Sequence, residues 1–323
     1  MDGLADKIFN TNDFAPENVG GSGAPLAMQR TLANPIGCIG VGLHSGAQIS
    51  LTLHPAPVNS GIVIRRSDLG ISFPARFDLV TDTRLCTLLH PENRPDARVG
   101  TVEHVMAALA AMGVTNAAIE VDGPEIPVLD GSAAPFLFLL DCAGLVDQNA
   151  AAAIIEVRRP VRIDDGDGFA ELLPAPSFPG LRMEIAIDFS ASVIGRQTLQ
   201  LDLTQSMFRH ELAGARTFAM AGEIDTLRKA GLARGGSLEN AVVVDNDRVL
   251  NPAGLHQPDE FVRHKMLDAV GDLYLAGAAL QGIFRANRPG HAMNNRLLRA
   301  LFADPANYSF IRPNLSPNLS RAA

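Results

Sequence analysis

An internal repeat is the feature that most constrains the fold of this chain. The segments LTLHPAPVNSGIVI, from residue 51, and AELLPAPSFPGLRMEI, from residue 170, share their proline and glycine positions. Pro55, Pro57 and Gly61 each recur 119 residues later. In both segments alternating apolar residues flank the Pro/Gly turn, a pattern that predicts two strands joined by a loop. We therefore expect two related structural units.

A second pair of matching segments supports the repeat. VEHVMAALA, from residue 102, matches VRHKMLDAV, from residue 262, so that His104 and His264 occupy equivalent positions. Each segment is followed by a strand-like run and then by a helix-like run that opens at Gly131 or at Gly290. The collinear order of these matches predicts two copies of one α+β unit.

The repeat defines the expected domains. Residues 28–150 form the first α+β domain and residues 151–312 form the second. The offset between matching positions grows from 119 to 160 residues, so the second copy carries about forty extra residues, including a helix, a Gly-rich turn and a strand around 220–245. Inserted elements of this kind often carry specificity. We expect residues 1–27 to form a flexible extension and residues 313–323 to form a C-terminal tail.

Charge and composition exclude several classes of protein. The net charge is −8 and no Lys/Arg run is present, whereas nucleic-acid binding requires a basic surface. The longest apolar run, VMAALAAMGV, is shorter than the ~18 residues that span a membrane, and no signal peptide is evident, so a cytoplasmic protein is expected. Cys38, Cys86 and Cys142 lack paired spacing, which indicates reduced thiols rather than metal ligands.

The segment FVRHKMLDAVGDL, residues 261–273, contains the main candidate site. Its apolar residues share one face of a helix, and His264, Asp268 and Asp272 form a polar line at four-residue spacing on the other face. Such a line is typical of a solvated surface helix, so periodicity alone leaves both a surface and a metal site open. The repeat favours the metal site because it can bring His264 and His104 to one domain interface, where ligand sites are common.

Two imidazoles and one carboxylate, from His104, His264 and Asp268, match the ligand set of a catalytic zinc ion, which keeps a fourth position for water. Glu103 is the candidate general base. It precedes His104 in the first turn of a helix that Thr101 is expected to cap. Adjacent helix residues diverge by about 100°, so one can bind the metal while the other reaches the water. A first-turn glutamate is also typical of a favourable helix start.

Three further residues lie near this candidate site. His291 follows a Pro/Gly turn at an expected helix start, where a lowered imidazolium pKa would suit a proton donor, although a lone histidine there is more often capping or solvated. Asp272 is a candidate for orienting His291. Lys265 is either solvated or pairs with a substrate phosphate. The remaining histidines are expected in loops or at strand edges and to be structural: His44, His54, His90, His210 and His256.

Six segments together resemble a known family. They are GVGLHSG, TVEHVMAALAAMGVTNAAIEVDGPEIPVLDGSAAPF, ARTFA, GLARGGSLENAVVV, EFVRHKMLDAVGDL and GHAMNN, in this order over roughly residues 28–312. They closely resemble the UDP-3-O-acyl-N-acetylglucosamine deacetylases of Gram-negative bacteria, which use zinc to remove an N-acetyl group in the committed step of lipid A synthesis. The resemblance implies two copies of one α+β fold in a β-α-α-β sandwich, with the site between the domains.

The resemblance also implies roles for individual residues. The zinc ligands fall on His104, His264 and Asp268 and the base on Glu103, as the spacing had indicated. His291 is implied as general acid or electrostatic partner of the transition state, held by Asp272. The remaining implied residues concern catalysis or substrate binding: Thr217, which helps to stabilise the oxyanion; Phe218, which packs on substrate; and Lys265 and Arg288, which lie near the nucleotide phosphates. The insertion around 220–245 resembles an acyl-chain passage.

Two positions depart from the family pattern, and the resemblance also implies a substrate. Met220 and Leu172 stand where the family often has aromatic residues, which affects acyl-chain and uracil packing. The implied partner is UDP-3-O-[(3R)-3-hydroxyacyl]-N-acetylglucosamine, bound by a monomer that contacts the inner membrane leaflet transiently, without insertion, and binds no nucleic acid. Two alternatives remain at this point, a zinc amidase acting on another amide and a non-catalytic protein that binds nucleotide sugars or acyl chains.

Overall fold

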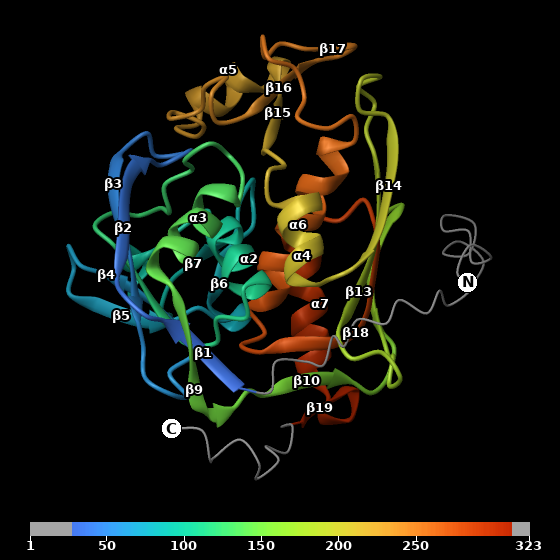
Figure 1. The fold of residues 1–323 in the computed structure, drawn as a ribbon. Helices are drawn as coiled ribbons and strands as arrows, with labels where there is room; N and C mark the ends of the chain where they lie inside the picture. The colour runs from blue at the N-terminus through green and yellow to red at the C-terminus, as the bar shows by residue number, and fades with distance from the viewer. Residues whose placement is uncertain (1–27, 312–323) are drawn as a thin grey trace.

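Two β-sheets face each other across a layer of helices in the computed structural model of the chain, which describes residues 28–311 (Figure 1). The α+β class is the one that the repeat predicts, and the sandwich arrangement is the one that the family resemblance implies. The predicted extension, residues 1–27, and the predicted tail, residues 313–323, lie outside the described residues, as does residue 312.

The first repeat contains a five-stranded sheet in the order β2-β3-β8-β4-β5. Its strands are β2 (Ile36–Val41), β3 (Gln48–Pro55), β4 (Ile62–Arg66), β5 (Ile71–Pro74) and β8 (Ala117–Val121). Only β4 and β8 run parallel. Along β3, buried side chains alternate with more exposed ones, because one face of the sheet packs inward and the other does not. Two helices belong to this repeat: α2 (Glu103–Ala111) and α3 (Ala134–Ala143).

The second repeat has the same strand order and directions, β11-β12-β18-β13-β14, with only β13 and β18 parallel among these strands. They are β11 (Val161–Asp165), β12 (Gly168–Leu173), β13 (Leu181–Asp188), β14 (Arg196–Asp202) and β18 (Ala279–Asn287). β10 (Ile154–Val157) and β19 (Tyr308–Ile311) extend this sheet, and its helices are α6 (Glu260–Tyr274) and α7 (His291–Ala303). The predicted duplication is confirmed strand for strand.

Smaller elements surround the two sheets. The insertion forms a separate sheet at the top of Figure 1, made of β15 (Phe218–Met220), β16 (Val242–Asp245) and β17 (Arg248–Val249), beside α5 (Ala221–Lys229). The other short strands are β1 (Met28–Leu32) paired with β9 (Leu145–Ala151) and β6 (Val80–Asp82) paired with β7 (Leu88–Leu89). The short helices include α4 (Gln205–Met207) and a π-helix (Phe208–Leu212). Within residues 28–311, no helix is both long and apolar enough to cross a membrane.

Helices α2 and α6 pack against each other at the centre of the sandwich. All residues of α6 except Arg263 and Lys265 are buried, so its polar line is not a solvated surface. The helices approach closely because position 271 is a glycine: a Cβ there would lie 1.9 Å from the carbonyl oxygen of Glu103. Gly271 therefore lets the first turn of α2 pack against the C-terminal half of α6.

We expect Gly271→Ala to lower the free energy of unfolding by about 1–3 kcal/mol, because the added methyl group forces the two helices apart. Urea unfolding of the metal-free protein measures this change. Gly222→Ala in α5 is the matched control, since a Cβ at position 222 meets nothing within 4 Å. That variant should be neutral or more stable by less than about 1 kcal/mol. Equal effects of the two substitutions would contradict the role of Gly271.

Candidate metal centre

Three candidate ligands converge at the contact between α2 and α6. His104 comes from α2, whereas His264 and Asp268 lie one turn apart on α6. The Oδ1 atom of Asp268 lies 3.3 Å from Nε2 of His264 and 3.6 Å from Nε2 of His104. The three potential ligand atoms all lie within 4.8 Å of one another, and all three residues are buried. Side chains from both repeats therefore form one possible metal site.

The chemistry of this group fits a zinc ion. Asp268 Oδ1 is buried and has no hydrogen-bond partner among the described residues, an arrangement that is costly unless a cation compensates it. His264 Nδ1 lies 3.0 Å from the carbonyl oxygen of Ala215 and donates a hydrogen bond to it, so Nε2 presents its lone pair toward Asp268. Two imidazole nitrogens and one carboxylate oxygen form a ligand set that zinc accepts.

Burial and neighbouring charges set the protonation of these groups. Burial lowers the pKa of His264 to about 4, so the imidazole is neutral at pH 7, as a metal ligand must be. Burial alone would raise the pKa of Asp268, but the basic groups of His264 and Lys265 hold it well below its usual value. With His264 neutral, the ammonium of Lys265, 2.9 Å from Asp268 Oδ2, supplies the charge that keeps Asp268 ionised.

Glu103 lies next to His104 in the first turn of α2, is buried, and accepts a hydrogen bond on Oε2 from the backbone N–H of Thr87 at 3.0 Å. Burial raises the pKa of Glu103.

The predicted cap by Thr101 is wrong. Thr101 has a positive φ of 56° and its hydroxyl donates to Glu125 at 2.9 Å, so the N-cap residue is Val102, which makes no side-chain cap bond.

His291 is the first residue of α7 and is paired with Asp272 of α6. Its Nδ1 lies 2.9 Å from Oδ2 of Asp272, which also accepts a hydrogen bond from Asn294 at 2.9 Å. Burial alone would lower the pKa of His291, but the charges of Asp272 and Glu103 raise it to about 9. The expectation that a helix start lowers this pKa is therefore wrong, because two carboxylates lie nearby and outweigh the helix dipole.

A cavity of about 460 Å³ contains the possible metal site. The other site residues expected from the sequence that line it are Glu103, His291, Thr217, Phe218 and Lys265, together with Met220. Arg288 does not line this cavity and instead pairs with Asp188 at 2.8 Å. Leu172 is fully buried in β12, so the side chain at this position contacts the core and not a ligand.

Sequence reasoning missed Thr87. Its backbone N–H donates to Glu103, and its hydroxyl donates to Oδ1 of Asp272 at 2.5 Å. Thr87 therefore holds the carboxylate beside the metal site and the carboxylate that pairs with His291. No local pattern indicates this role, because Thr87 and Asp272 are 185 residues apart in the chain. Asn294 was also missed, although its position one turn after His291 is a usable signal.

Comparison with known proteins gives a consistent result. The family model described as LpxC, UDP-3-O-acyl N-acetylglycosamine deacetylase, matches residues 29–303. A protein of Idiomarina loihiensis named UDP-3-O-acyl-N-acetylglucosamine deacetylase is 50% identical over 290 residues, which cover 88% of this chain and 93% of the relative. Proteins with the same name from Shewanella loihica and Shewanella frigidimarina are 50% identical over 86% of this chain and 91% and 90% of their own lengths.

In the metal-free protein, we expect NMR titration to place the His291 midpoint near pH 9. Because folding raises this pKa from 6.5, protonated His291 stabilises the fold fully below pH 6.5, and this stability is lost as the pH rises through about 9. Asp272→Asn removes the main attractive charge, so the midpoint should fall toward or below 6.5. A wild-type midpoint at or below 6.5 would contradict the effect of the carboxylates.

Proposed function

The chain belongs to the family of UDP-3-O-acyl-N-acetylglucosamine deacetylases, and we propose that His104, His264 and Asp268 hold the zinc ion that its reaction requires. The enzyme hydrolyses the N-acetyl group of UDP-3-O-[(3R)-3-hydroxyacyl]-N-acetylglucosamine to give UDP-3-O-acyl-glucosamine and acetate, the committed step of lipid A biosynthesis. One observation carries the metal assignment: a buried carboxylate oxygen that has no hydrogen-bond partner within residues 28–311 faces two imidazole nitrogens.

Glu103 is the proposed general base. A zinc ion held by His104, His264 and Asp268 would supply a Lewis acid and would lower the pKa of the attacking water toward about 7. Glu103 lines the same cavity beside His104, and the N–H of Thr87 holds one of its oxygens in place. Its raised pKa suits it to accept the proton of the attacking water and to hold that proton during the reaction.

His291 is proposed to act on the leaving nitrogen of the amide, and Thr217 on its carbonyl oxygen. His291 lines the cavity and carries a proton at neutral pH, because its pKa is raised to about 9. As the amide C–N bond breaks, His291 donates this proton to the departing glucosamine nitrogen, and Asp272 stabilises and orients the imidazolium. Thr217 also lines the cavity, where its hydroxyl donates a hydrogen bond to the oxyanion that develops on the acetamide carbonyl.

Substrate binding is assigned to groups around the cavity. Lys265 and Phe218 line it and are proposed to contact the substrate, Lys265 through a phosphate. Arg288 has an exposed side chain that is proposed to exchange its partner Asp188 for the nucleotide phosphates. The insertion around 220–245, whose strand β15 includes the cavity residue Met220, is proposed to guide the acyl chain.

The setting of the reaction is proposed from the substrate. We propose a cytoplasmic monomer composed of domains 28–150 and 151–312. Because the substrate is acylated, this monomer works in transient contact with the inner leaflet of the membrane. No nucleic acid is expected as a partner, since the net charge is −8.

Acetate release from UDP-3-O-acyl-N-acetylglucosamine tests the proposed function. We expect a chelator that removes the zinc to abolish release, and Glu103→Ala to retain zinc while turnover falls by about 10²–10⁴-fold, since a general base contributes a factor of this size. Zinc content is measured on the same samples. Full activity in Glu103→Ala, or activity that persists after complete zinc removal, would refute the mechanism.

His291→Ala is the companion variant in this assay. It should keep a near-normal zinc content and lose most of its turnover, because His291 contacts Asp272 and is not one of the proposed ligands. Loss of zinc in His291→Ala would show that a ligand has been misassigned.

A further inference from the structure

The two histidines of the metal site are held differently. His104 Nδ1 is buried and has no hydrogen-bond partner among the described residues. His264 Nδ1, in contrast, donates to the carbonyl oxygen of Ala215 at 3.0 Å. Such a contact to the second ring nitrogen fixes both the tautomer and the orientation of a metal-binding histidine. The orientation of His264 therefore depends on what holds the Ala215 carbonyl.

The peptide unit between Ala215 and Arg216 is hydrogen-bonded to α6 through both its carbonyl oxygen and its N–H. Its carbonyl oxygen accepts from His264, and its N–H, which belongs to Arg216, donates to Oε1 of Glu260 at 3.0 Å. Glu260 and His264 are four residues apart on α6, so they lie on the same face of the helix. Because a peptide unit is planar, fixing its N–H also fixes the direction of its carbonyl.

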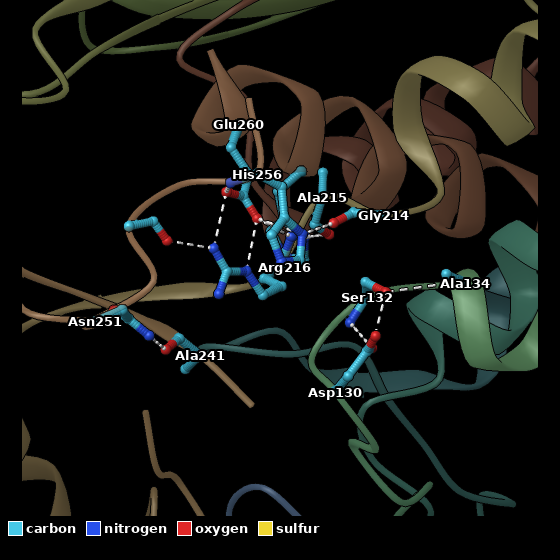
Figure 2. Close-up of polar contacts among 12 residues, drawn as sticks. Asp130, Ser132, Ala134, Gly214, Ala215, Arg216, Ala241, Asn251, His256 and Glu260 are labelled. Atoms are coloured by element: carbon cyan, nitrogen blue, oxygen red, sulfur yellow. Dashed lines mark hydrogen bonds and ion pairs between the residues drawn. The ribbon is translucent and has the colours of Figure 1, made fainter. Parts of the chain in front are cut away.

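A buried ion pair anchors this peptide unit (Figure 2). The side chain of Arg216 donates to Glu260 through Nε at 2.8 Å and through Nη2 at 3.1 Å, and Nη2 also donates to the carbonyl of Gly254 at 2.8 Å. The N–H of His256 donates to Oε2 of Glu260 at 2.7 Å. The side chains of Arg216 and Glu260 are only 7% and 1% exposed, so water cannot replace these bonds.

The ionised form of Glu260 is the one that this surrounding stabilises. Burial by itself would raise the pKa of Glu260, but the hydrogen bonds from Arg216 and from the N–H of His256 lower it. Every contact to Glu260 described above is donated by an N–H group, so a carboxylate is satisfied here where a neutral amide would not be.

The same segment continues directly into the cavity. The N–H of Thr217 donates to the carbonyl of Gly131 at 2.8 Å, and the Thr217 carbonyl accepts from Val242 at 2.7 Å. Residue 131 has room only for glycine, because a Cβ there would lie 2.0 Å from the carbonyl oxygen of Asn240. Thr217 is therefore fixed between the first repeat and the insertion, while Arg216 ties the preceding peptide to α6.

We propose that Arg216 and Glu260 are positioning residues of the metal site: their ion pair holds the 215–217 segment so that the Ala215 carbonyl fixes His264 as the Nδ1–H tautomer and Thr217 faces the cavity. This inference rests on the proposed function, since it concerns the same site. Neither residue lines the cavity that contains the metal site. A purely structural pair would affect only the stability of the fold.

Glu260→Gln in the full-length chain tests this proposal. The variant keeps the volume of the side chain but places an amide N–H₂ where only donors surround it, so the peptide unit should rotate. We expect the zinc affinity, measured by competition with a chelator of known affinity, to fall about 10–100-fold. In ¹⁵N NMR of the metal-free protein, His264 should change from the Nδ1–H tautomer to a mixture, and kcat should fall with little change in KM.

Arg263→Met is the matched control. Arg263 forms ion pairs with Asp259 and Glu211, lies on the same helix and makes no hydrogen bond to the 215–217 segment. It should retain wild-type zinc affinity and the wild-type His264 tautomer. If Glu260→Gln does not fold, Arg216→Lys, which keeps the charge but loses the forked contact, should weaken zinc binding by about tenfold.

Two outcomes separate this inference from the proposed function. Wild-type zinc affinity and an unchanged His264 tautomer in a folded Glu260→Gln or Arg216→Lys protein would overturn the positioning role, even if the wild type releases acetate. A wild type that binds zinc but releases no acetate would refute the proposed function, while weaker zinc binding in Glu260→Gln would still support the positioning role.

Discussion

The close contact between α2 and α6 is the constraint on which the rest of the structure depends. These helices occupy equivalent places in the two repeats, and Gly271 allows α6 to approach the backbone of Glu103. The contact is the reason that His104 from one repeat reaches His264 and Asp268 from the other. The duplication places one helix from each repeat at the interface. Each copy supplies a histidine at the equivalent position, and the second copy adds Asp268 where the first has Ala108.

The cost of burying the polar line of α6 is offset because each of its residues has a specific hydrogen-bond or ion-pair partner. Glu260 extends this line by one turn, so that four polar residues follow one another at four-residue spacing: Glu260, His264, Asp268 and Asp272. Their partners come from other parts of the chain or from the next turn: Arg216, the Ala215 carbonyl, Lys265 and His291. Among the carboxylate oxygens of these four residues, only Oδ1 of Asp268 is buried without a hydrogen-bond partner in residues 28–311, and it faces the two imidazoles. The possible metal site therefore lies at Asp268, the residue of the line whose hydrogen bonding is incomplete.

Much of the fold could be predicted from the sequence, because repeated Pro/Gly turns and matching helices are local patterns. The spacing of His264 and Asp268, joined to His104 by the repeat, also indicated the metal group. The contacts of Thr87 and Arg216 could not be predicted, since each partner lies far away in the chain and no periodicity marks it. The cap assigned to Thr101 was wrong because its hydroxyl donates a hydrogen bond to Glu125, a residue from another segment.

X-ray absorption at the zinc edge of the zinc-loaded protein tests the central claim most directly, because it reports the ligand atoms themselves. The account predicts two imidazole nitrogens at about 2.0–2.1 Å, carboxylate oxygen at about 2.0–2.2 Å and no sulfur, with one imidazole lost in His264→Ala. A sulfur shell near 2.3 Å, which a thiolate such as that of the buried Cys86 would give, would contradict it. Fewer than two imidazoles in the wild type would also contradict a site shared between α2 and α6.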